Sequence, residues 1–142
     1  DHRDLHSFPT RRSSDLMAKE KFTLEYNMKS TPVAMLWAYI ATENGLKEWF
    51  ADKVTMQGKE VILDWNGSEQ VMVIVGMRND KFIRYRWQED TDKTYFEFKI
   101  STTELSGTSI LTITDFAEPE DLEEAKELWD YQIEILQRQL GC

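Results

Sequence analysis

Histidine is nearly absent from this chain, which contains only His2 and His6. Both lie within the first sixteen residues, so the rest of the sequence contains none. Ser-His and Cys-His nucleophile systems and histidine-based metal sites all need this side chain. Those classes of enzyme and metal centre are therefore excluded for the sequence that follows residue 16.

Cysteine is equally scarce, because Cys142 is the single one. One cysteine can form neither a disulfide framework nor a thiolate metal site, and no nearby histidine is available to activate it. The six glycines form no glycine-rich phosphate loop, and Gly67 and Gly107 have the sequence context of turns. We therefore expect an exposed spectator thiol at Cys142, no metal and no cofactor.

Positive charge is also in short supply, since 17 Lys and Arg oppose 26 Asp and Glu for a net charge of -9. Nucleic acids and anionic lipid surfaces both attract basic proteins. The longest apolar run, Val33–Ala41, is far shorter than the ~20 residues that span a bilayer. The segment MAKEKFTLEY from Met17 has charges where a signal peptide is apolar. We predict a cytoplasmic protein that binds no nucleic acid and does not insert into membranes.

Residues 1–16 lack any hydrophobic period, and the stretch HSFPTRRSSDL resembles a translated DNA-sequencing adapter. We expect these residues to be a disordered, non-native leader that is to be left out of fold reasoning. Residues 17–142 then form a single domain, because 126 residues are enough for one hydrophobic core.

The sequence after the leader is strongly patterned. Apolar and polar residues alternate over residues 22–28, which predicts a half-buried strand. Ser30-Thr31-Pro32 suits the start of a helix, and apolar residues recur at helical spacing over residues 33–40. Asn44-Gly45 is expected to break this helix before a second short helix over residues 46–51.

A run of strands is expected between residues 52 and 115, because turn dipeptides recur there, and Asn66-Gly67 favours a type I′ hairpin. The predicted strands are residues 52–57, 60–65, 69–77, 81–87, 94–103 and 108–115. One face of the sheet should be apolar and aromatic, and the other largely polar. Residues 71–75 are apolar on both faces, so this strand should be central or its outer face should meet something else.

A long helix is predicted after Pro119, which suits a first helical turn, and Gly141 should end it. Its apolar residues lie three to four apart: Leu122, Ala125, Trp129, Ile133, Leu136 and Leu140. About 22 residues would make it about 33 Å long. A core this small cannot surround such a helix, so we expect it to lie across the apolar face of the sheet.

Three segments occur in a characteristic order: Ser30-Thr31-Pro32-Val33 through Trp37, Asn44-Gly45-Leu46 with Trp49-Phe50, and residues 107–116. With this order, the chain resembles members of the START-like superfamily, which have the helix-grip fold. Within it, the chain is similar to the bacterial branch related to the co-chaperone that activates a heat-shock ATPase. The resemblance implies an α+β fold in which a curved, seven-stranded antiparallel sheet wraps around the long C-terminal helix. It also implies a cavity that often holds an apolar ligand. The superfamily includes carriers, enzymes and protein-binding modules, so the fold alone does not choose a function.

Aromatic residues supply the candidate site. The hypothetical cavity-lining residues are Trp37, Trp49, Phe50, Tyr85, Trp87, Phe96, Phe98, Trp129 and Ile133. Such a set can form a pocket for a planar or lipidic ligand, or its rings can fill the space themselves. Arg84 and Arg86 alternate with Tyr85 and Trp87, so we expect both arginines on the outer face, solvated or paired with Glu97 or Glu69.

Three function hypotheses remain open. The first is a non-enzymatic domain that binds an apolar small molecule or lipid. The second is a protein-interaction module, in which the outer face of the sheet or the acidic start of the last helix contacts a protein partner or a second copy. The third is an enzyme for a bulky apolar substrate, with a strand carboxylate such as Asp64, Glu97 or Asp115 as base. A metal site at Asp90 and Asp92 lacks the glycine and distal glutamate of a calcium loop.

Overall fold

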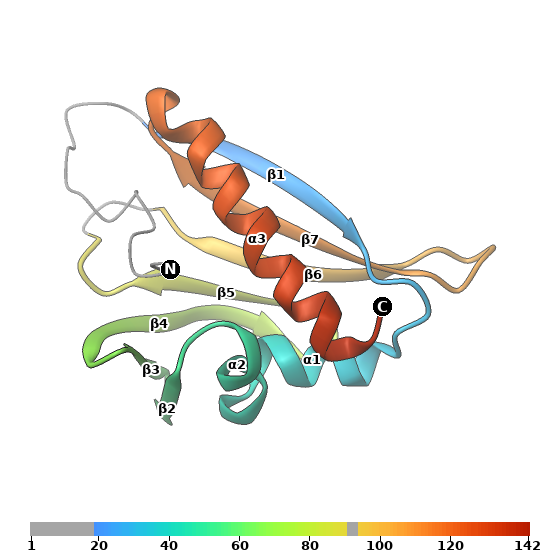
Figure 1. Ribbon diagram of the computed structural model, residues 1–142, viewed down its shortest axis with the longest axis horizontal. Helices are drawn as coiled ribbons and strands as arrows, with labels where there is room; N and C mark the ends of the chain where they lie inside the picture. The colour runs from blue at the N-terminus through green and yellow to red at the C-terminus, as the bar shows by residue number, and fades with distance from the viewer. Residues whose placement is uncertain (1–18, 91–93) are drawn as a thin grey trace.

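The computed structural model describes residues 19–90 and 94–142, and Figure 1 shows their arrangement. The expected leader, residues 1–16, lies outside the described residues. Within the described part, seven antiparallel strands form one sheet in the order β1-β7-β6-β5-β4-β3-β2. Their bounds are β1 Glu20–Asn27, β2 Lys53–Gln57, β3 Glu60–Trp65, β4 Ser68–Arg78, β5 Phe82–Trp87, β6 Phe96–Thr102 and β7 Ser109–Ala117. The predicted seven-stranded sheet is confirmed.

The helices connect and cover this sheet. Their bounds are α1 Val33–Ala41, α2 Glu43–Trp49, the short 3-10 helix η3 Pro119–Asp121, and α3 Leu122–Leu140. The chain leaves β1 through α1 and α2 to reach β2 at the opposite edge, and the meander then returns strand by strand until β7 pairs with β1. Figure 1 shows α3 crossing the concave face of the sheet diagonally, with α1 and α2 beside its C-terminal half.

The turn between β3 and β4 has the predicted geometry. Asn66 and Gly67 have φ angles of 54° and 87°, and a type I′ turn needs positive φ at both central residues. The neighbouring register is continuous, with Trp65 opposite Ser68. This turn therefore sets which side chains of β3 and β4 share the concave face.

The break between α1 and α2 lies earlier than predicted. Asn44-Gly45 does not end a helix, because α2 starts at Glu43 and contains Gly45. The separation occurs at Thr42, whose Oγ1 accepts a hydrogen bond from the Gly45 N–H at 3.0 Å and so caps α2. A Cβ on Gly45 would collide with the backbone carbonyl oxygen of Ala38. Glycine is needed here because α2 folds back closely onto the last turn of α1.

Pro119 begins the last helical segment as predicted, but its first turn is a 3-10 helix and not an α-helix. Pro119 opens the 3-10 helix η3, and the regular α3 follows with 19 residues, about 29 Å at 1.5 Å per residue. Gly141 has a φ of 79° and donates its N–H to Arg138, and Cys142 donates to Gln137, as in a Schellman end. The buried stripe of α3 is Ala125, Trp129, Gln132, Ile133 and Leu136. Leu122 and Leu140, at the predicted ends of the stripe, are half-buried.

Two tyrosines attach helices to strands. The buried Tyr85 of β5 donates its hydroxyl to the carbonyl of Ile40 in α1 at 2.8 Å, and Tyr26 of β1 donates to Asp130 of α3 at 2.6 Å. Burial raises the pKa of Tyr85 well above its usual value near 10. Burial, followed by the hydrogen bond to Asp130 and its negative charge, does the same to the pKa of Tyr26. At alkaline pH values that ionise both phenols in the unfolded chain, the folded state therefore keeps them protonated.

We expect Gly45→Ala to lower the free energy of unfolding by at least the ~1–3 kcal/mol typical of overpacking, because the new methyl group meets backbone rather than a movable side chain. Urea unfolding followed by circular dichroism measures the change. Asn44→Ala, at the exposed neighbouring position in α2, is the matched control. Equal stability of the two variants would contradict the close approach of α1 and α2.

We expect Trp129→Ala to cost ~3–5 kcal/mol, the range for large aromatic truncations in cores, because this indole is 1% exposed. That is a large part of the ~5–15 kcal/mol that stabilises a domain, so the variant should be unfolded or nearly so. Gln139→Ala, at an exposed position of the same helix, should melt like the parent. A Trp129→Ala melting temperature within a degree or two of the parent would show that α3 does not dock through this stripe.

The stability of the protein should fall as pH rises above ~10, because the unfolded chain then releases a phenol proton that the folded Tyr85 retains. The contribution of the Tyr85 proton to the free energy of unfolding is complete below pH ~10. It declines by about 1.4 kcal/mol per pH unit above that value. Tyr85→Phe should lower stability at neutral pH, since the Ile40 carbonyl loses its donor, but it should show a shallower alkaline decline. Urea titrations between pH 8 and 11 compare the two slopes, and identical slopes would contradict a retained proton on Tyr85.

Candidate ligand-binding site

Aromatic side chains from five elements, β3, β5, β6, α2 and α3, pack together between the sheet and α3. The Phe96 ring of β6 lies at the centre, with its centroid 5.3 Å from that of Tyr85 and 5.6 Å from those of Trp87 and Trp129. Phe50, which follows α2, stacks on Phe96 at 6.0 Å and on Trp129 at 6.4 Å. These separations are those of favourable ring pairs. We call this group, together with Trp49, Trp65 and Phe98, the aromatic cluster.

The predicted site residues occupy two kinds of position. Eight of the nine are buried in one hydrophobic core: Trp49, Phe50, Tyr85, Trp87, Phe96, Phe98, Trp129 and Ile133. The ninth, Trp37 of α1, is only half-buried and packs against the edge of that core. The rings of the cluster contact one another directly, as the space-filling interpretation of the sequence expects.

Trp65, which is 4% exposed, was not among the site residues predicted from the sequence. Its ring centroid lies 6.1 Å from Phe50 and 6.4 Å from Trp87. The alternation of Val61, Leu63 and Trp65 along β3 was the available signal, because residues two apart share one face of a strand. Trp65 extends the aromatic cluster from β5 toward the β2 edge of the sheet.

Polar hydrogens of the aromatic cluster are directed at protein acceptors. The indole N–H of Trp65 donates to the Phe50 carbonyl at 2.9 Å, and that of Trp49 donates to the Tyr39 carbonyl at 2.8 Å. The Trp129 indole donates to Asp115 Oδ2 at 2.9 Å. Buried donors normally have such partners. These hydrogen bonds fix the orientation of the three indole rings.

Asp115 is the strand carboxylate that the structure places inside. It is 5% exposed and accepts from Trp129 through Oδ2 and from the Phe116 N–H through Oδ1 at 2.7 Å. Its place follows the alternation Leu111, Ile113, Asp115 in β7, a signal that the sequence analysis did not use. Both carboxylate oxygens accept protein N–H groups, so the observed role of Asp115 is to orient the Trp129 indole.

The other two strand carboxylates lie away from the core. Asp64 accepts the Gly67 N–H in the β3–β4 turn at 2.7 Å. Glu97 pairs with Arg84 on the convex face at 2.8 Å, and the Arg84 guanidinium lies 4.4 Å from the centroid of the Tyr95 ring. The expected outer-face position of Arg84 and its pairing with Glu97 are therefore present. These charges stabilise the convex face and do not reach the aromatic cluster.

Gln132 is a buried polar residue that was not among the candidates predicted from the sequence. It lies among apolar residues on the buried stripe of α3 and is 0% exposed. Its Nε2 donates to the carbonyl of Trp49, the last residue of α2, at 3.2 Å. Its Oε1 is buried and accepts no hydrogen bond from the described residues. This oxygen is therefore an unused acceptor at the boundary between α2 and α3.

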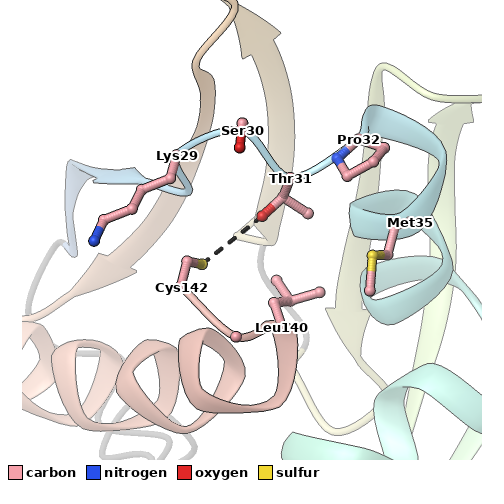
Figure 2. A pocket seen from close by; sticks show the side chains of 8 residues that line it. Lys29, Ser30, Thr31, Pro32, Met35, Leu140 and Cys142 are labelled. Atoms are coloured by element: carbon pink, nitrogen blue, oxygen red, sulfur yellow. Dashed lines mark hydrogen bonds between the residues drawn. The ribbon is translucent and has the colours of Figure 1, made fainter.

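An open groove of about 490 Å³ lies elsewhere, where the end of α3 meets α1 and the segment before it (Figure 2). It is lined by Lys29, Ser30, Thr31, Pro32, Met35, Leu140, Gly141 and Cys142. Thr31 Oγ1 donates to the Met28 carbonyl at 2.7 Å and lies 3.8 Å from Cys142 Sγ. The groove shares no residue with the aromatic cluster and is mostly polar, so it does not match the ligand-binding surface expected from the sequence.

Neither a metal-ligand cluster nor a membrane-spanning helix occurs in the described residues. No group of three or more His, Cys, Asp or Glu side chains there could hold a metal ion. Asp92 of the considered Asp90–Asp92 site lies outside the described residues. No helix within the described ranges is long and apolar enough to cross a membrane.

Comparison with known proteins identifies the family. A model of the START-like superfamily domain matches residues 16–142. BfR322 from Bacteroides fragilis is 42% identical, over 87% of this chain and 92% of its own, with a TM-score of 0.66. The Aha1 dimer from Colwellia psychrerythraea is 13% identical, over 85% and 96%, with a TM-score of 0.70. DynU16 of the dynemicin biosynthetic locus is 13% identical, over 87% and 48%, with a TM-score of 0.71.

These similarities differ in what they establish. The two 13% identical structures share the fold with this chain, while no curated protein matches it. The family model spans nearly the whole chain, and it agrees with the concave antiparallel sheet and the long C-terminal helix described above. The chain belongs to the START-like superfamily.

Proposed function

We propose that this domain binds an apolar, ring-containing small molecule between the concave face of the sheet and α3, and that it does so without catalysing a reaction. The aromatic cluster is the observation that supports this most directly. Ligand sites in proteins are mostly apolar and aromatic, with a few polar groups that fix orientation. A planar ligand that enters the cluster would exchange ring–ring contacts for ring–ligand contacts of the same kind and distance.

Entry of a ligand requires some of these rings to move, and Phe50 and Trp49 are the best candidates. Both lie at the end of α2, a helix of seven residues, whereas Phe96, Phe98 and Trp87 stand on central strands held by ladders on both sides. Displacement of Phe50 would uncover faces of Phe96 and Trp129, which it contacts. The ligand would then lie under α2, against β5, β6 and α3.

We propose binding without catalysis because the polar groups near the aromatic cluster are engaged in hydrogen bonds within the protein. Asp115 engages both of its oxygens in hydrogen bonds to protein N–H groups. The buried phenol of Tyr85 donates to the Ile40 carbonyl, and its raised pKa keeps it protonated. Neither group is placed to act as a general base, which favours binding over chemistry.

Tryptophan fluorescence tests the proposal, since all five tryptophans lie in the described part and four of them are buried. Titration of the full chain with fatty acids, flavonoids and polycyclic aromatic dyes should give a saturable change for at least one class, at micromolar affinity (about -8.2 kcal/mol). Phe96→Leu should weaken that binding by about two- to tenfold, the equivalent of one lost aromatic contact. Phe116→Leu, the same change on a half-buried ring of the convex face, is the matched control and should bind like the parent.

Equal affinities for Phe96→Leu and the parent would show that any bound molecule lies outside the aromatic cluster. Absence of saturable binding with every class would contradict the proposed function. It would leave the second candidate, contact with a protein partner or second copy through the convex face. The observation behind that candidate is an apolar row on this face, in which Ile62 lies opposite Val71 and Val75 is 39% exposed at the β4 bulge.

A further inference from the structure

The most informative unexplained atom in the described residues is Oε1 of Gln132. The atom is buried, yet no donor among the described residues reaches it. An amide oxygen left without a partner in a core destabilises the folded state, and native proteins keep few of them. A leucine or methionine at this position would avoid the cost and continue the apolar stripe of α3. The polar side chain therefore calls for a reason beyond packing.

The other half of the same amide shows how the side chain is oriented. Nε2 donates to the Trp49 carbonyl at 3.2 Å, one of the carbonyls that the end of a helix leaves without an intrahelical partner. A carbonyl accepts but cannot donate, so the amide must present its nitrogen there. Oε1 consequently points along the other arm of the amide, away from the Trp49 carbonyl.

The surroundings of Gln132 belong to the aromatic cluster. Trp49, whose backbone it contacts, has its ring 5.3 Å from Phe50 and 5.8 Å from Phe98. Trp129 lies one helical turn before Gln132 on the same buried stripe. The indole N–H groups of Trp49 and Trp129 already donate to Tyr39 and Asp115. These donors of the cluster are committed elsewhere, so the hydrogen that suits Oε1 has to arrive with another molecule.

We propose, on the basis of the proposed function, that Gln132 selects the ligand by accepting a hydrogen bond from a neutral hydroxyl or N–H group on an aromatic skeleton. An anionic ligand fits less well. The buried polar residues among those described are Thr31, Ser109, Thr114, Asp115, Glu118 and Gln132. This set contains no lysine or arginine to pair with a buried carboxylate, and Asp115 and Glu118 add negative charge. A phenol or fused-ring alcohol is therefore preferred over an unsubstituted ring and over a carboxylic acid.

Three probes on one skeleton test this inference: naphthalene, 2-naphthol and 2-naphthoate, each titrated by fluorescence or calorimetry into the full chain. The parent should bind 2-naphthol about five- to tenfold more tightly than naphthalene, the range for one buried hydrogen bond, and 2-naphthoate most weakly. Gln132→Leu should abolish the preference for 2-naphthol while it retains or improves binding of naphthalene. Gln139→Leu, at an exposed position of α3, should leave all three affinities unchanged. If the leucine variant does not fold, Gln132→Met, with an unbranched side chain of similar length, takes its place in the same titrations.

The outcomes separate this inference from the function on which it rests. Equal binding of naphthalene and 2-naphthol by the parent would overturn the role of Gln132 but leave a ring-binding site intact, with a buried water as the donor to Oε1. A preference for 2-naphthol that persists in Gln132→Leu would also overturn it. Failure of every probe, including the flavonoids and dyes, would remove the proposed function and this inference together.

Discussion

Burial of one face of α3 against the concave face of the sheet is the contact on which the rest of the structure depends. Most of the stability of a helix in a protein comes from the packing of its amphipathic face, and α3 has such a face along its 19 residues. An antiparallel sheet with one apolar face likewise needs a covering layer. Each element supplies the layer that the other lacks. The opposite side of α3 meets solvent with charged pairs such as Glu134 and Arg138. α1 and α2 then cover the remaining part of the same face while they carry the chain from one edge strand to the other.

Buried hydrogen bonds between the helices and the sheet give this packing one arrangement. Apolar burial is non-directional, so it would tolerate a helix displaced by a turn. A displaced helix would break the hydrogen bond from the Trp129 indole to Asp115 or the one from Tyr85 to the Ile40 carbonyl. Each broken bond would leave a buried polar group unpaired. Gln132 differs from these residues, since only one end of its amide is satisfied. That difference connects the packing of the domain to its proposed selectivity.

The superfamily supplies the fold, and the side chains have to supply the function. Structures 13% identical to this chain share its architecture, and one architecture can host carriers, enzymes and interaction modules. In this chain the face between sheet and helix is rich in aromatic rings and has Asp115 committed to Trp129. The proposed binding of a ring system rests on this interior. The same residues would then serve both stability and binding.

The order and the type of the elements could be predicted from local sequence patterns. Alternation identified each strand to within two residues, and eight of the nine proposed site residues lie in one core, because side-chain period and turn chemistry are local properties. Features that depend on contacts between separate elements could be read only from the three-dimensional packing. The close approach of Gly45 to Ala38 moved the helix break to Thr42. The crossing of α3 over β7 joined Trp129 to Asp115, and its contact with α2 placed Gln132 against Trp49. Those pairs are 14 and 83 residues apart in sequence, and no local pattern specifies which side chains a packed helix and sheet bring together.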